Sequence, residues 1–153
     1  MSRIRIKNFG PIKEGLNENN GWIDIEKTTL FVGNQGSGKS TVAKLVSTFC
    51  WIEKALYRGD FKKKWFEEKN RLKNTFLTYH RLEHYLNEPD PMTPSGSEID
   101  YEGDAFKIKY RDGKLSITAI QNSNYALPQI MYVPSERNLL SFTRKVKDST
   151  LDS

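Results

Sequence analysis

Residues 28–46, TTLFVGNQGSGKSTVAKLV, contain an apolar run, a glycine-rich run and the start of an amphipathic stretch in direct succession. Thr28 to Val32 is nearly all apolar or β-branched, which is typical of a strand covered on both faces. From Lys39 onward, apolar residues recur at helical spacing until Gly59, and this predicts a long amphipathic helix. Its apolar positions are Val42, Leu45, Val46, Phe49, Ile52 and Leu56. The segment therefore predicts a strand, a loop and a helix in that order.

The loop, Gly33 to Ser40, satisfies the pattern GxxxxGK[ST] of a P-loop. Glycines allow positive φ and bring backbone N–H groups close to an anion, and the helix that follows adds the positive end of its dipole. We expect Lys39, the candidate catalytic residue, to reach the β- and γ-phosphates of ATP, and the Ser40 hydroxyl to coordinate Mg²⁺. The predicted nucleotide-binding residues are Gly33, Asn34, Gln35, Gly36, Ser37, Gly38, Lys39, Ser40 and Thr41. The predicted cofactors are thus ATP and Mg²⁺.

Shorter patterns lie on both sides of this segment. Arg3 to Phe9 alternates apolar with basic residues, and Trp22 to Glu26 is a second short β pattern. Phe61 to Leu86 predicts a second helix, with a thinner apolar stripe. Asn87 to Ser97 contains three prolines and a glycine, so it predicts a loop.

The last third of the sequence predicts an antiparallel meander over about 97–120. We expect two-residue turns at Gly103-Asp104 and Asp112-Gly113. These turns would set the pairs Tyr101 with Phe106, Ile99 with Ile108, Tyr110 with Leu115, and Ile108 with Ile117. All of these apolar residues would then face the same side. Beyond the meander, Gln129 to Val133 predicts another strand and Ser135 the cap of a further helix.

Length and composition indicate one globular α/β domain. Eight Phe, seven Tyr and three Trp in 153 residues supply core material that a disordered chain would lack. The single cysteine, Cys50, excludes an intramolecular disulfide. No signal-peptide pattern opens the sequence, and no apolar stretch approaches the roughly 18 residues of a membrane span, so we expect a cytoplasmic protein. A net charge of +5 favours anionic partners.

Three stretches taken together resemble a known family. They are Ile4 to Gly10 (IRIKNFG), the strand and P-loop with the helix start at 28–46, and Met131 to Arg137 (MYVPSER). In this order they resemble the N-terminal lobe of ABC-type ATPases of the chromosome-maintenance and RecF kind, closest to the OLD-like "AAA family ATPase" branch. The resemblance implies a P-loop NTPase lobe with a mixed sheet, a helical insertion at about 60–88 and a flanking antiparallel meander. It also implies that Asn8 and Phe9 lie near the nucleotide base.

Two motifs that such relatives carry downstream of the P-loop do not occur in this sequence. There is no Ser-Gly-Gly-like signature, and no predicted strand after Lys39 is a run of four apolar residues that ends in Asp or Glu, as a Walker B strand is. Without those carboxylates the site lacks a second Mg²⁺ anchor and a group to orient water. We therefore expect the chain to be a fragment of a larger ATPase, which binds nucleotide and hydrolyses it weakly unless a C-terminal lobe or partner completes it. The resemblance further implies a homodimer.

Alternative functions rest on other residues. His80, Glu83 and His84 match the HxxEH pattern of a zinc hydrolase, which would need both imidazoles one helical turn apart. The basic run between Arg58 and Lys73, interleaved with aromatic residues, could follow the backbone of a nucleic acid in a repair or defence module that uses ATP as a switch.

A small P-loop kinase is a further alternative, with Arg137 or Arg144 as a lid arginine. In an ATPase, Arg137 could instead reach the γ-phosphate or cross a dimer interface, because an arginine can stabilise charge on a transferred phosphoryl group. A surface arginine at a helix start explains Arg137 equally well.

Overall fold

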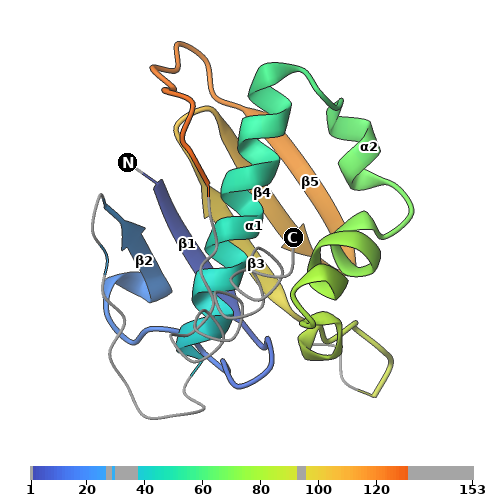
Figure 1. Ribbon diagram of the computed structural model, residues 1–153. Helices are drawn as coiled ribbons and strands as arrows, with labels where there is room; N and C mark the ends of the chain where they lie inside the picture. Colours follow the sequence, from blue (N-terminus) through green and yellow to red (C-terminus); the bar gives the residue numbers. More distant parts are fainter. Residues whose placement is uncertain (1, 27–28, 30–37, 93–95, 131–153) are drawn as a thin grey trace, which may run out of the picture.

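The computed structural model describes residues 2–26, 29, 38–92 and 96–130 of the chain. Five strands form one sheet in the order β2-β1-β3-β4-β5, and every neighbouring pair is antiparallel (Figure 1). The strands are β1 (Ser2–Lys7), β2 (Trp22–Ile25), β3 (Glu98–Glu102), β4 (Phe106–Arg111) and β5 (Lys114–Ala119). Short 3-10 turns, η1 (Asn19–Gly21) and η3 (Glu83–Tyr85), lie in the connections.

One long helix, α1 (Lys39–Arg58), lies across one face of the sheet (Figure 1). Its bounds agree with the predicted start at Lys39 and end near Gly59. The core forms between its apolar stripe and the alternate, inward-facing residues of β1, β3 and β4. Fully buried members include Leu45, Phe49, Ile52, Ile4, Ile99 and Ile108. Helix α1 is therefore fixed to the sheet along most of its length.

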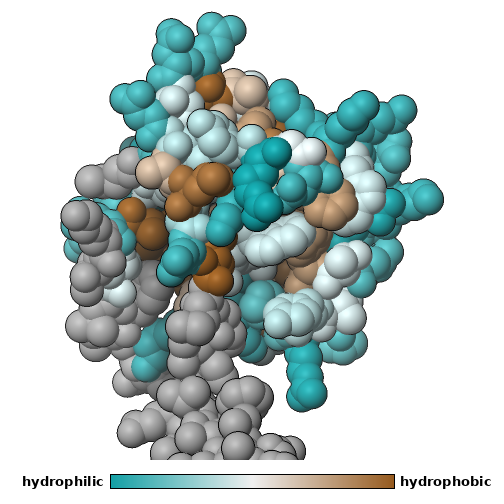
Figure 2. Space-filling model, turned by 45° about the horizontal axis from the view of Figure 1, so that its top comes forward, coloured by the Kyte–Doolittle hydropathy of each residue, from teal (hydrophilic) through white to brown (hydrophobic). Residues whose placement is uncertain are grey.

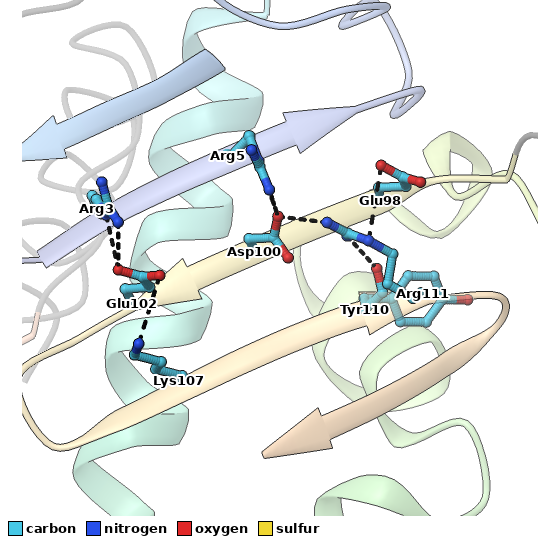
Figure 3. A network of polar contacts seen from close by, with 8 residues as sticks. All are labelled: Arg3, Arg5, Glu98, Asp100, Glu102, Lys107, Tyr110 and Arg111. Carbon is cyan, nitrogen blue, oxygen red and sulfur yellow. Dashed lines mark hydrogen bonds and ion pairs between the residues drawn. The ribbon is translucent and has the colours of Figure 1, made fainter. Parts of the chain in front are cut away.

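The opposite face of the sheet is charged (Figure 3). Asp100 lies at its centre, only 2% exposed, and its carboxylate accepts hydrogen bonds from Arg5 and from Arg111. Arg3 pairs with Glu102 at 2.8 Å. Hydrophilic residues also cover most of the described surface seen in Figure 2, with small hydrophobic areas between them. The charged face of the sheet explains why β1, β3 and β4 alternate apolar and charged residues.

The predicted single helix over Phe61 to Leu86 is wrong. The structure has a short α2 (Lys63–Glu67), a π-helical segment η2 (Leu72–Leu77) and the turn η3. Glu68 is extended after α2, and Lys69 and Asn70 adopt positive φ before η2 begins, so the first helix does not continue. The aromatic residues of this region pack around one another and against α1, and this cluster comprises Trp51, Phe61, Trp65, Phe66 and Phe76. Tertiary packing has overridden the helical pattern here.

The meander is confirmed, but one of its turns differs from the prediction. The second hairpin has the expected register, with Tyr110 opposite Leu115. In the first hairpin Tyr101 pairs with Ile108 and not with Phe106, because the turn lies one residue later. The Gly103 amide donates to the Phe106 carbonyl at 2.9 Å, and Asp104 and Ala105 form the turn between them. A shift of two residues keeps every side chain on its expected face, so the core is unchanged.

The predicted mixed sheet is wrong for the described residues, since all of its pairings there are antiparallel. The coarser α/β composition is confirmed. P-loop folds usually build on parallel strands, and the strand predicted at Thr28 to Val32 lies, apart from Thr29, outside the described residues. Gln129 and Ile130 belong to no strand, and the rest of that prediction, with Ser135 and its helix, also lies outside. None of the helices in the described ranges is long and apolar enough to cross a membrane.

Candidate phosphate site

Helix α1 begins at the lysine of the P-loop motif. Gly38 precedes it in the left-handed conformation, with φ 97° and ψ 9°, and its carbonyl accepts the first helical hydrogen bond from the amide of Val42 at 2.9 Å. Only glycine adopts this conformation at low cost. Gly38, the last glycine of the motif, therefore occupies a left-handed position at which glycine is the favoured residue.

The space beside Gly38 is closed as well. A Cβ atom placed on Gly38 would lie 2.9 Å from Cγ1 of Ile12 and 3.6 Å from Cγ of Pro11. Ile12 belongs to a tight turn in which the Phe9 amide donates to the Ile12 carbonyl at 2.8 Å and the Ile12 amide donates back at 2.9 Å. The turn after β1 thus packs against Gly38, where no room remains for a side chain.

The first turn of α1, at the positive end of the helix dipole, contains no acidic residue. Its residues are Lys39, Ser40 and Thr41, and no side chain of the described residues caps the helix at Gly38. The first amides of any helix lack helical partners and attract anions. Lys39 is half-buried, Ser40 is exposed and Thr41 is 4% exposed. The Ser40 hydroxyl can therefore meet a ligand, whereas Thr41 packs into the protein.

The predicted residues Gly33 to Ser37 lie outside the described residues, as does Arg137. The structure therefore places only the last part of the motif, Gly38 to Thr41. These residues are contiguous, and the helix begins among them as the motif demands.

Asn8 and Phe9, expected near the base, lie in the same turn as Ile12. Phe9 is fully buried, and its ring meets that of Tyr85 edge to face with 6.0 Å between centroids. Asn8 has φ 52°, and its carbonyl accepts a hydrogen bond from the side chain of Asn87 at 2.8 Å. The position of these residues relative to a nucleotide stays a prediction.

The prediction that His80 and His84 lie one helical turn apart, as the HxxEH pattern requires, is wrong. Arg81 has φ 58°, so the chain turns after His80 and the two histidines do not share an α-helical turn. Nε2 of the exposed His84 lies 3.6 Å from the Glu83 carboxylate, whereas His80 is half-buried. Burial and the nearby Lys44 lower the pKa of His80. No group of three or more metal-binding side chains occurs within the described ranges.

The aromatic residues in the basic run mostly serve packing. Phe61, Trp65 and Phe66 contact one another, and the guanidinium of Arg71 lies over the Trp65 ring at 4.0 Å. These rings are engaged within the protein, which leaves fewer of them to stack on bases than the sequence pattern allowed.

The sequence interpretation missed a buried polar cluster in the second half of α1. Glu53 is 1% exposed, and its carboxylate accepts hydrogen bonds from the Tyr101 hydroxyl at 2.6 Å and from the Ala105 amide at 2.8 Å. Its position four residues after Phe49, on the apolar stripe of the helix, is the signal that could have identified it. This carboxylate fixes α1 to the turn between β3 and β4.

Comparisons with known proteins do not identify a relative. No protein-family model, no curated protein and no solved structure matches the chain. Any functional assignment therefore depends on the residues of this chain.

Proposed function

We propose that this chain binds MgATP as the Walker A lobe of an ABC-type, OLD-like ATPase. The observation that carries the proposal is the coincidence of motif and structure at Lys39: the GxxxxGK[ST] lysine is also the first residue of a 20-residue helix, directly after a left-handed glycine. In this proposal Lys39 binds the β- and γ-phosphates and Ser40 coordinates Mg²⁺.

Calorimetric titration with MgATP tests the proposal. We expect wild type to bind with one site per chain, and Lys39→Ala to bind roughly 10- to 100-fold more weakly, because it loses a charge-assisted contact to phosphate. Lys54→Ala is the matched control, since Lys54 lies on the same helix but not in its first turn. Equal affinities in wild type and Lys39→Ala would overturn the proposal. Parallel titrations with GTP determine the base preference.

Hydrolysis by this chain alone should be slow. Its 153 residues contain no strand pattern of four apolar residues that ends in Asp-Glu after the P-loop, so no carboxylate of that kind orients water. Steady-state release of phosphate from MgATP checks this point. Turnover above about 1 per second, an ordinary enzymatic rate, would contradict it.

A further inference from the structure

Described residues outside the predicted phosphate site form a pocket. It has a volume of about 100 Å³ and lies between the segment from Phe66 to Lys73 and the hairpin of β4 and β5. None of its lining residues belongs to the P-loop or to the first turn of α1. Its apolar lining includes Phe66, Leu72, Tyr110 and Leu115, each at most 8% exposed. The pocket thus has a rigid apolar floor supplied by the core.

Four basic and two acidic residues line this pocket. Lys69, Arg71 and Lys114 have no ion-pair partner among the residues that the structure describes. The two acidic residues of the lining have partners: Glu67 accepts a hydrogen bond from the Ile117 amide at 3.1 Å, and Glu88 pairs at 2.8 Å with Lys73, which lines the pocket too. An excess of positive charge therefore remains at the pocket.

Arg71 is the most constrained of the three. The central carbon of its guanidinium lies 4.0 Å from the centroid of the Trp65 ring, and its Nε atom is buried but has no hydrogen-bond partner in the described structure. A buried donor without an acceptor costs free energy that a bound acceptor would restore. The planar fork of arginine matches the oxygens of phosphate groups in particular.

The backbone that presents these cations has an unusual conformation. Lys69 and Asn70 adopt left-handed φ values of 55° and 49°, although neither is glycine. They are followed at once by the π-helical segment η2, and π-helical turns occur frequently at functional sites. Strained backbone of this kind persists where the surrounding structure holds it, and it gathers at ligand sites.

We propose that this pocket binds the phosphate group of a small phosphomonoester, with the apolar part of the ligand against Tyr110 and Leu115. Four basic and two acidic lining residues leave a net charge of +2, which a doubly charged phosphate balances better than a singly charged carboxylate does. The site is separate from the P-loop and does not depend on the nucleotide proposal.

Titration with phenyl phosphate, followed by ¹H–¹⁵N spectra of the whole chain, tests the proposal. We expect saturable shifts in the amides of residues 69–73 and 113–115, and an affinity at least about tenfold lower in Arg71→Gln and in Lys114→Gln. Lys109→Gln is the matched control, because Lys109 is exposed on the same hairpin but does not line the pocket. It should bind as wild type does.

The second variant keeps the test decisive if Arg71→Gln disturbs the fold, because Lys114 is an exposed residue at the start of β5. Absence of saturable shifts at these amides in wild type would overturn the proposal. Equal affinity in wild type and Lys114→Gln would overturn it too.

Discussion

The two ends of α1 are closed in different ways. At the C-terminal end, the Gly59 amide donates to the Leu56 carbonyl at 3.1 Å and the Asp60 amide donates to the Ala55 carbonyl at 3.0 Å, so the chain caps its own helix. At the N-terminal end, no described side chain caps Gly38 and the first turn has no acidic residue. Protein groups thus satisfy one end, while the other presents donors and positive charge. This difference is what a helix that binds phosphate would show.

The largest effect on stability is expected in the C-terminal half of α1, which Glu53 fixes to β3 and to the turn that follows it. Glu53→Ala leaves the Tyr101 hydroxyl and the Ala105 amide without their buried acceptor, and should lower the free energy of unfolding by roughly 3 kcal/mol. Urea denaturation of wild type and Glu53→Ala measures this loss in the free energy of unfolding. The neighbouring Lys54→Ala should change stability by less than about 0.5 kcal/mol. A Glu53→Ala protein as stable as wild type would show that this carboxylate does not hold the helix.

The two capping glycines provide the next comparison. Both have left-handed φ, but a Cβ on Gly59 would meet nothing within 4 Å, whereas one on Gly38 would meet Ile12. Gly59→Ala should therefore cost about 1 kcal/mol for its backbone alone, and Gly38→Ala about 2 kcal/mol or more.

Denaturation of the two alanine variants, with MgATP titrations alongside, separates the roles of the two ends. Nucleotide affinity should fall only in Gly38→Ala. If Gly59→Ala weakened binding as much, the two ends of α1 would not differ in the way we propose.

The smallest effect concerns pH and the contact between α1 and the segment after η2. Lys44 donates a hydrogen bond to the His80 carbonyl at 3.3 Å, and burial together with Lys44 holds the pKa of His80 below its ordinary value of 6.5. Protonation then favours the unfolded state, so stability should fall as pH drops below about 6.5. The urea midpoint at pH 7.5 and 5.5 measures this loss. His80→Gln should reduce it, while His84→Gln, at an exposed position, should not.

How much of this molecule could be predicted depends on the range of the interactions that decide each part. The bounds of α1 follow from a local apolar period and two glycines, and the structure confirms them. The first meander turn lies one residue later than predicted, because Ala105 is held by Glu53 from a distant helix. Nothing within the local sequence around Gly103 reports that hydrogen bond.

The same reasoning applies to the helical region and to the candidate site. The breaks at Lys69 and at Arg81 accompany packing of aromatic side chains against α1, a long-range effect that periodicity does not contain. At the site, the pattern predicted the helix start at Lys39, but the contact between Ile12 and Gly38 joins residues far apart in sequence. Motifs predict local geometry well. Residues that pack against a site from distant parts of the sequence are known only from the fold.

Backbone amide shifts upon addition of MgATP test the central claim most directly. The claim predicts large, saturable shifts at Gly38, Lys39, Ser40 and Thr41, with little change at the C-terminal end of α1 around Gly59 and Asp60. These shifts should disappear or require far higher nucleotide concentrations in Lys39→Ala. Saturable binding whose shifts leave residues 38–41 unchanged, or no saturable binding at all, would contradict the assignment of this helix end as a phosphate site.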